Sequence, residues 1–259
     1  MKPKVSIIIP YFNHGEYINQ ALNSVHNQGF DDYEIILVND SSVDKQSIEV
    51  FNALEHSKVR KYTISNGGPC VAKNYGVSMA RGSILGFLDS DNMLLSPYIK
   101  EAVYAIDTED FEWVFGDAEL FGCETGVKSQ KLKGLEEIFI NSVIDNCFFI
   151  KKSTFESIGG FDESLSRLGL EDWELSVRLI INNIRFKHLE SPLFKYRVLE
   201  DSRTNKEAKD NRELIMKYVF EKHHLSLFEN YSNMFFKLLK TENKFEVKLG
   251  NRIRRILGK

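Results

Sequence analysis

The 259-residue sequence predicts an α/β fold, in which helices flank a mostly parallel sheet and a helical extension follows at the C-terminal end. Short apolar runs alternate with helical patterns through the first ninety residues, as in strand-helix-strand units with right-handed crossovers. The first run, VSIII, is continuous, which is typical of a strand covered on both faces. From about residue 208 the pattern is helical and polar.

The first half of the chain contains the clearest elements. Apolar runs predict four strands, at Val5–Ile9, Ile35–Val38, Val59–Ile64 and Ile84–Leu88. Asn13 is predicted to open the first helix with Glu16 as capping-box partner, and Ser41 with Asp44 to open the second. A third helix is expected over Val71–Arg81, ending at Gly82.

The pattern is looser after Asn92. We expect helices after Ser96-Pro97, between Ser153 and Gly159-Gly160 with Glu156 in its cap, and over Glu171–Asn183, and strands at Trp113–Asp117 and Asn146–Lys151. The last helix carries an apolar stripe of residues spaced by three or four, namely Trp173, Val177, Ile180 and Ile184.

Composition excludes several classes of protein. The formal net charge of −3 does not suggest a nucleic-acid binder. The three cysteines are far apart, which fits neither a disulfide framework nor a zinc site and suggests a reducing compartment. Because no run reaches the ~20 apolar residues of a membrane span and no signal-peptide pattern is present, we expect a soluble, cytoplasmic protein.

Two carboxylates, Asp89 and Asp91, follow the fourth predicted strand in the segment FLDSDN. Ligands of parallel sheets bind at the carboxyl ends of the strands, where this segment lies. Mg²⁺ and Mn²⁺ prefer oxygen ligands and are often shared with substrate phosphates, so a metal-bound diphosphate is one partner for the pair. A solvated turn is the alternative, because Asp-Ser-Asp-Asn favours turns.

Two further segments follow neighbouring strands. Asp40 ends the second strand and could accept the imide N–H of a uracil ring or cap the next helix. The segment NGGPCVAKNYG, residues 66–76, follows the third strand, and its glycines permit close backbone approach. Lys73 could meet a phosphate there, although a turn with a surface lysine would have the same residues.

An acidic pair opens the helix at Glu171. The helix dipole favours the ionised form of Glu171 and Asp172, as a general base requires. Acidic residues are also common in first turns without any catalytic role. Trp173 fits a pocket wall or the apolar stripe of its helix equally well.

In their order, these segments resemble glycosyltransferase family 2. The resemblance rests on VSIIIPYFNHGEYINQALNSVHNQ, EIILVNDSSVD, NGGPCVAKNYG, ILGFLDSDN, IGGFDESL and EDWELSVRL, and it runs from about Val5 to Arg197. It implies an inverting, nucleotide-sugar-dependent enzyme with the GT-A fold, a Rossmann-like α/β fold. A catalytic domain would then cover 1–205, with a nucleotide-binding half 1–92 and an acceptor-binding half 93–205, and a basic helical extension would cover 206–259.

The resemblance also implies roles for single residues. The nucleotide sugar would meet Pro10, Tyr11, Asn13, Asp40, Asn66, Gly67, Lys73, Asp89, Ser90 and Asp91. Asp91, with Asp89, would hold Mn²⁺ or Mg²⁺, and Asp172 would be the catalytic base with Glu171 beside it. Trp173, Glu171 and Arg197 would face the acceptor.

Three positions depart from the family pattern. Lysine stands at position 73, where arginine is frequent, so the bidentate fork is lost. Asn92 stands where a second acid is frequent. The segment YRVLEDSRT, which begins at Tyr196, contains no histidine, which puts in doubt a histidine contact to metal or phosphate from that segment.

The end of the chain is basic. Residues 233–259 carry eight basic side chains against two acidic ones, interspersed with apolar residues. A basic amphipathic helix suits an anionic membrane surface, so a peripheral contact with the inner membrane is one expectation. Packing on the catalytic domain and pairing with another subunit, as in a homo-oligomer, are the alternatives.

The resemblance to glycosyltransferase family 2 implies transfer of a hexosyl or N-acetylhexosaminyl group from a UDP-sugar to a glycan or polyprenyl-diphosphate-linked acceptor, in surface polysaccharide (O-antigen or capsule) synthesis. A nucleotidyltransferase is a second candidate, but PYFNHGEY lacks a glycine-rich basic loop after the first strand. An inactive sugar-nucleotide-binding module would have lost Asp91 or Asp172, and both are present. A dehydrogenase is disfavoured because G-x-G-x-x-G is absent.

Overall fold

The structure is a computed structural model that describes residues 2–139, 141–200, 211–226 and 228–229. It divides into two compact units, Met1–Ile215 and Met216–Lys259. The basic segment 233–259 lies outside the described residues, so its predicted helix and membrane contact stay predictions. In the part of the chain that the structure describes, no helix is long and apolar enough to cross a membrane.

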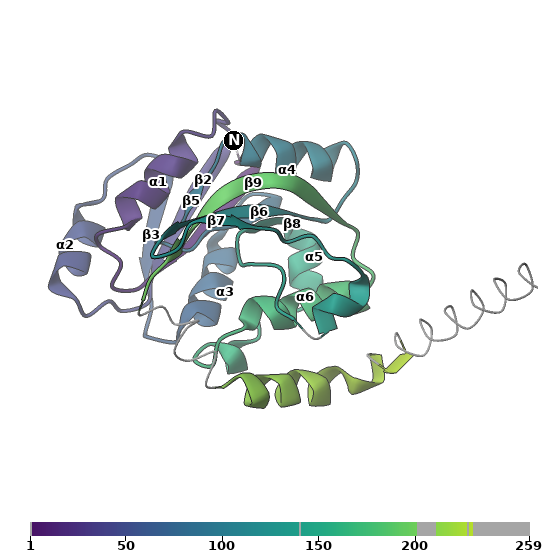
Figure 1. Ribbon diagram of the computed structural model, residues 1–259. Coiled ribbons are helices and arrows are strands. Elements are labelled where there is room, and N and C mark those ends of the chain that lie inside the picture. The colour runs from purple at the N-terminus through teal and green to yellow at the C-terminus, as the bar shows by residue number, and fades with distance from the viewer. Residues whose placement is uncertain (1, 140, 201–210, 227, 230–259) are drawn as a thin grey trace, which may run out of the picture. The chain divides into compact units, whose positions relative to one another are not determined.

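A single mixed sheet of nine strands organises the described part of the first unit (Figure 1). Its order is β3-β2-β1-β4-β8-β6-β9-β5, and β7 pairs with β6. The strands are β1 Val5–Tyr11, β2 Tyr33–Asn39, β3 Val59–Thr63, β4 Ile84–Phe87, β5 Met93–Leu94, β6 Trp113–Gly122, β7 Gly126–Lys128, β8 Phe148–Lys151 and β9 Phe186–Val198.

The predicted parallel arrangement is confirmed for one half of the sheet. Strands β3, β2, β1 and β4 are all parallel to their neighbours. Beyond β4 the sheet is mixed, because β8 runs antiparallel to both β4 and β6 whereas β6 and β9 are parallel. The carboxyl ends of the parallel strands therefore face the start of β8.

Helices cover both faces of the sheet (Figure 1). α1 (Ile18–His26), α2 (Lys45–Ala53) and α4 (Tyr98–Asp107) contribute to one buried apolar cluster. α3 (Pro69–Met79), α5 (Lys152–Ser157) and α6 (Glu171–Ile181) contribute to the other. This double cover explains why β1 and β2 read as continuous apolar runs. Two short 3₁₀ helices lie at Leu135–Phe139 and Glu163–Leu165. Residues 212–226 are also helical, in agreement with the helical pattern predicted from about residue 208.

Several predicted helix ends are wrong. Asn13 does not cap α1, which begins at Ile18 without a side-chain cap; Asn13 has φ 55° and its side-chain oxygen accepts hydrogen bonds from two backbone N–H groups of residues 43 and 44. α3 runs from Pro69 to Met79, so Gly82 is not its end. Gly82 instead packs against β1, where an added Cβ would lie 2.7 Å from the Ser6 nitrogen.

Other caps give mixed outcomes. Asp44 caps α2, and its carboxylate accepts a hydrogen bond from the Ser47 N–H at 2.7 Å. Ser41, predicted to open this helix with Asp44, does not cap it; its hydroxyl donates to the Ile64 carbonyl. α5 begins at Lys152 without a side-chain cap, so the predicted cap by Ser153 and Glu156 is wrong. α6 begins at Glu171 as predicted.

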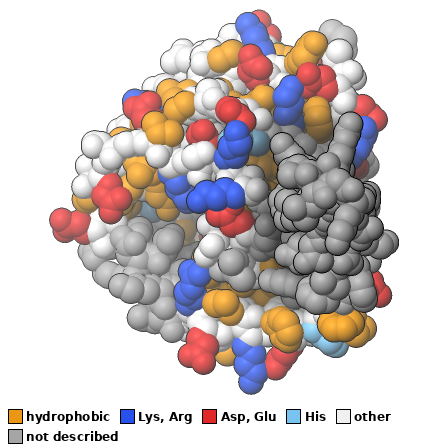
Figure 2. All heavy atoms as spheres, turned by 45° about the vertical axis from the view of Figure 1, so that its right-hand side comes forward, with side chains coloured by type: hydrophobic (Ala, Val, Ile, Leu, Met, Phe, Trp, Pro, Cys, Tyr) orange, Lys and Arg blue, Asp and Glu red, His pale blue; other side chains and the backbone are white. Residues whose placement is uncertain are grey.

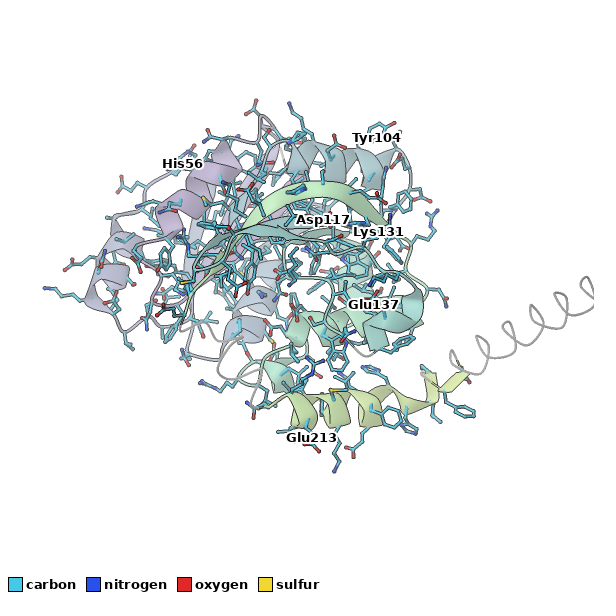
Figure 3. All side chains as sticks on the ribbon, in the orientation of Figure 1. His56, Tyr104, Asp117, Lys131, Glu137 and Glu213 are labelled. Atoms are coloured by element: carbon cyan, nitrogen blue, oxygen red, sulfur yellow. The ribbon has the colours of Figure 1, made fainter. Side chains whose placement is uncertain are left out.

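The long strand β9 was not predicted from the sequence. Its polar residues and the internal Pro192 argue against a strand. Pairing with β6 overrides this local preference, and the register shifts on either side of Asp117, which Figure 3 labels on β6. At this bulge His188 Nε2 lies 2.7 Å from Asp117 Oδ1. β9 then carries Arg197 to the carboxyl-end edge of the sheet.

The surface carries mixed charge. Figure 2 shows one face of the molecule, on which Lys and Arg side chains are interspersed with Asp and Glu side chains. Such mixing agrees with the small net charge of the chain.

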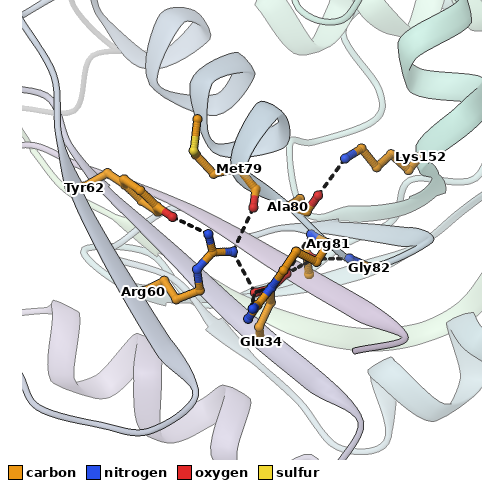
Figure 4. A network of polar contacts seen from close by, with 9 residues as sticks. Glu34, Arg60, Tyr62, Met79, Ala80, Arg81, Gly82 and Lys152 are labelled. Carbon is orange, nitrogen blue, oxygen red and sulfur yellow. Dashed lines mark hydrogen bonds and ion pairs between the residues drawn. The ribbon is translucent and has the colours of Figure 1, made fainter. Parts of the chain in front are cut away.

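A buried carboxylate, Glu34 on β2, links β1, β3 and the segment that follows α3 through hydrogen bonds (Figure 4). It accepts hydrogen bonds from the Ser6 hydroxyl, the backbone and guanidinium of Arg81, and the guanidinium of Arg60. Burial alone would raise the pKa of Glu34, but these donors outweigh it and lower the pKa.

Glu34→Gln is expected to lower the free energy of unfolding by about 1.5–3 kcal/mol, because it removes charge from hydrogen bonds to two guanidinium groups. A lowered carboxyl pKa gives stability that is present above about pH 4.5 and lost below it, so the gap between wild type and variant should narrow in acid. Urea unfolding at several pH values measures this. Glu49→Gln, on an exposed i,i+4 pair, is the control, and an equal effect there would contradict the prediction.

Candidate active site

A cavity of about 790 Å³ opens at the carboxyl ends of the parallel strands, within the range of roughly 300–1,000 Å³ typical of small-molecule sites. Loops after β1, β2, β3 and β4 form one side, and segments 142–146, 166–172 and 196–199 form the other. Most of the predicted site residues line it: Pro10, Tyr11, Asp40, Asn66, Lys73, Asp89, Ser90, Asp91, Glu171, Asp172 and Arg197.

Lys73 is the positive partner of the first aspartate of FLDSDN. Its ammonium, on a side chain only 1% exposed, lies 3.2 Å from Asp89 Oδ1 and 3.4 Å from Glu171 Oε1. α3, the end of β4 and the start of α6 therefore meet at one ion cluster. The predicted contact of Lys73 with phosphate remains a prediction, and the ammonium already serves these two carboxylates.

Asp91 is bound into the site through its backbone. Its carbonyl accepts a hydrogen bond from Arg197 Nε at 3.0 Å, and the backbone N–H of Arg197 donates to the side chain of Asn92. The Arg197 guanidinium stacks over Tyr17 and Phe121, 4.3 Å from each ring centre. Arg197 thus fixes the segment that carries the aspartates; its predicted acceptor contact stays a prediction.

The Asp91 carboxylate itself makes no ion pair with a cationic side chain among the described residues. Burial raises its pKa to about 6, with His14 opposing this rise and Asp89 adding to it. Two neighbouring carboxylates, one of them buried, can together bind a cation. Asp91 and Asp89 could therefore supply oxygen ligands to Mn²⁺ or Mg²⁺. In the described part of the chain no group of three or more His, Cys, Asp or Glu side chains could hold a metal alone, so such an ion would need further ligands, such as phosphate oxygens.

Asp172 lies in the first turn of α6 and lines the same cavity. Its Oδ1 accepts a hydrogen bond from the Trp173 N–H at 2.7 Å. Burial, followed by the charges of Glu171 and Asp145, raises the pKa of Asp172 to about 7. The expectation that the helix dipole keeps this group ionised is therefore corrected, because loss of hydration outweighs the dipole.

Asp40 organises the loop after β3. Its carboxylate accepts hydrogen bonds from the backbone N–H groups of Gly67 and Gly68, at 2.7 and 2.8 Å, and from the Asn66 amide. Gly68 has φ 86°, and an added Cβ would lie 2.5 Å from Ser166. A carboxylate has about four acceptor positions, and these three donors occupy three of them. The N–H of a uracil ring would have to use the remaining one.

Three predicted residues do not line the cavity. The Trp173 indole is 3% exposed and donates to the Ile138 carbonyl, so the structure gives no support to its predicted acceptor contact. Asn13 holds the segment before α2, and Gly67 contributes a backbone N–H to Asp40. Tyr11 lines the cavity, but its hydroxyl donates to the Ser47 carbonyl.

Several polar or charged lining residues were missed from the sequence, among them His14, Lys128, Asp145 and Asn146. His14 Nδ1 lies 2.8 Å from the Ser90 hydroxyl. The cavity therefore contains a histidine from the β1–α1 loop, although the segment directly after Arg197 has none. Its place just after β1 was the available signal. Lys128 lies 3.6 Å from Asp145, and Asn146 donates to Glu171. Nothing in the local sequence around these three residues indicates a site.

Similarity to known proteins agrees with this geometry. The family model described as glycosyl transferase family 2 matches residues 6–161, and one described as the N-terminal domain of galactosyltransferase matches residues 140–201. An uncharacterized glycosyltransferase of Methanocaldococcus jannaschii is 25% identical over 90% of this chain and 83% of its own length.

Two relatives match more locally. An uncharacterized glycosyltransferase of Haemophilus influenzae is 37% identical over 38% of this chain and 40% of its own length. The GalNAc(5)-diNAcBac-PP-undecaprenol beta-1,3-glucosyltransferase of Campylobacter jejuni is 31% identical over 63% of this chain and 53% of its own. The chain thus spans about half or less of these two relatives.

Solved structures show the same fold. TarS of S. aureus in complex with UDP-GlcNAc has a TM-score of 0.65 at 23% identity, covering 80% of this chain and 61% of TarS 1-349. Its complex with UDP has a TM-score of 0.62 at 24% identity, covering 76% and 61%. Because the family model spans more than half of the chain and the fold is that of a GT-A glycosyltransferase, this chain belongs to glycosyltransferase family 2.

Proposed function

We propose that this chain is an inverting glycosyltransferase that moves a sugar from a UDP-sugar to a hydroxyl group of a glycan or lipid-linked glycan. The observation that carries the proposal is one cavity with a carboxylate pair, Asp89 and Asp91, and a second acidic group, Asp172, whose pKa of about 7 suits a general base. The relatives support the substrate classes, since one is named for an undecaprenol-linked acceptor and TarS was solved with UDP and UDP-GlcNAc.

In the proposed reaction, the oxygen of the acceptor hydroxyl attacks the anomeric carbon of the donor. Asp172 accepts the proton that this hydroxyl loses. The bond from that carbon to the diphosphate breaks on the opposite face, and UDP leaves with the bonding electron pair. One displacement inverts the configuration, so no nucleophile of the enzyme is required. The Lys73 ammonium keeps Asp89 and Glu171 in place through its two ion pairs.

Asp91 and Asp89 are the residues that would hold Mn²⁺ or Mg²⁺. Such an ion neutralises charge that develops on the departing diphosphate. Asn92 and Arg197 fix the backbone of this segment, so the two carboxylates are positioned before any ligand binds.

Asp91→Ala is expected to remove metal-dependent UDP binding, with a rise of about tenfold or more in Kd. The test measures UDP affinity by calorimetry with and without Mn²⁺, together with hydrolysis of UDP-glucose, UDP-galactose, UDP-GlcNAc and UDP-GalNAc. Asp31→Ala, at an exposed side chain outside the cavity, is the matched control. Hydrolysis of one donor by wild type would support the proposal; UDP binding without turnover in the presence of acceptors would favour an inactive binding module instead.

The basic segment 233–259 supports a further part of the proposal, a peripheral contact with an anionic membrane. Deleting residues 244–259 removes six of the eight basic side chains and is expected to lower binding to phosphatidylglycerol vesicles by about tenfold or more, at ~1 kcal/mol for each charge near the surface. Vesicle co-sedimentation measures this, with neutral phosphatidylcholine vesicles as control. Equal binding by the full and shortened chains would contradict it.

A further inference from the structure

Asn146 has a buried oxygen with no partner at the wall of the active-site cavity. The side chain is 8% exposed, and its Oδ1 accepts no hydrogen bond from any described residue. Its Nδ2 donates to Glu171 Oε1 at 3.1 Å. Leaving a buried acceptor unsatisfied costs about 1–3 kcal/mol, which is unusual in a folded protein unless a ligand or water completes it.

The orientation of this amide follows from its partner. Glu171 is ion-paired with Lys73, and an ionised carboxylate can only accept hydrogen bonds. The nitrogen of the amide must therefore face Glu171, and the oxygen must be the atom left without a partner. The ligand group that satisfies it has to be a donor, such as a hydroxyl.

The position of Asn146 indicates which part of the substrate its oxygen would contact. The antiparallel register of β4 and β8, in which Gly86 pairs with Phe149, brings the segment before β8 beside the aspartates that follow β4. The contacts Asp89–Lys73–Glu171–Asn146 form one continuous chain. Asn146 thus contacts the first turn of α6, which carries Asp172, and it is linked to Asp89 through Glu171 and Lys73.

We propose that Asn146 Oδ1 accepts a hydrogen bond from a ring hydroxyl of the transferred sugar and so determines which sugar is accepted. This inference rests on the proposed function. In a single displacement the transferred sugar must lie between the diphosphate at Asp89 and Asp91 and the base Asp172. Asn146 lines the same cavity and contacts Glu171, the neighbour of that base. A site built to bond a hydroxyl discriminates against analogues that lack it.

The experiment is a double-mutant cycle between the protein and the donor. The probes are the UDP-sugar that wild type hydrolyses and its monodeoxy analogues, tested with wild type, Asn146→Ala and Asn182→Ala. Asn182 is a matched asparagine at the end of α6, whose amide donates to the Arg178 carbonyl away from the cavity. We expect one analogue to lower kcat/KM of wild type and of Asn182→Ala by about tenfold. Asn146→Ala should lose a similar factor with the full donor and nothing further with that analogue.

Affinity for UDP separates a contact with the sugar from a structural defect. UDP has no transferred sugar, so Asn146→Ala should bind it as wild type does, whereas a distorted site would bind it less well. If the alanine variant does not fold, Asn146→Ser, which replaces the amide by a hydroxyl on a shorter side chain, takes its place in the cycle.

For every donor analogue, the loss from Asn146→Ala and the loss from the missing hydroxyl could simply add. That result would overturn the inference and mean that a water molecule satisfies Oδ1. Coupling to a deoxy acceptor in place of the donor would also overturn it and assign Asn146 to the acceptor side. Failure of the proposed function gives a different result, because wild type would then hydrolyse no UDP-sugar in the panel.

Discussion

Asp172→Asn is expected to lower the transfer rate by about 10²–10⁴-fold, the range for losing a general base. The amide has nearly the same shape, so UDP affinity should change little. Comparison of kcat with UDP binding therefore tests the chemical role. Asp107→Asn, at the end of α4 outside the cavity, is the matched control. A variant that keeps more than about a tenth of wild-type activity would mean that another group accepts the proton.

The pH profile gives an independent test of the same group. A base works only when deprotonated, so wild-type kcat should rise with pH through about 7, the pKa to which burial and Glu171 raise Asp172. The residual activity of Asp172→Asn should lack this rise. A wild-type profile that is flat between about pH 5 and pH 8 would contradict the assignment.

As pH rises, the free energy of unfolding should fall while activity rises. The folded pKa of Asp172 lies above the ordinary value, so the folded state binds more protons than the unfolded state between about pH 4 and pH 7. The free energy of unfolding therefore falls as pH rises through this window. Asp172→Asn removes that loss and should melt at a higher temperature than wild type at about pH 8, which a thermal melt measures.

The N-terminal half of the fold was predictable because its elements are local. β1, β2 and β4 are buried and mostly apolar, and helices α1 and α2, which follow β1 and β2 directly, pack apolar residues into the core. The acidic residues at the strand ends were predictable for the same reason, because parallel strands collect their carboxyl ends at one edge. The shared cavity follows from that topology.

The second half was less predictable because its pairings are distant in sequence. β9 contains Pro192 and several charges, and it is a strand only because β6 accepts it along ten paired positions. The same dependence on long-range contacts hid Asn146, a single amide whose role follows only from its contact with Glu171. The pKa of Asp172 was misjudged because the sequence shows the helix start and not the burial.

Lys73→Met is expected to lower the free energy of unfolding by about 3–5 kcal/mol, the cost of leaving buried charges without their partner. Methionine keeps the length and the apolar stem of the side chain, which is 1% exposed, and removes only the ammonium. Asp89 and Glu171 then lose the ammonium that pairs with both of them. Urea unfolding measures the loss, and Lys45→Met, on an exposed pair with Glu49, should cost less than about 1 kcal/mol.

The electrostatic cause has its own signature. Protonation of either acid relieves the repulsion, so the deficit of Lys73→Met should be smaller at about pH 5 than at about pH 8. Adding Glu171→Gln should restore part of the lost stability, because one of the two carboxylates becomes neutral. The deficit could instead be the same at both pH values and unchanged in the double variant. Lys73 would then stabilise the fold by packing, for instance on the Phe161 ring. Its ion pairs with Asp89 and Glu171 would contribute little.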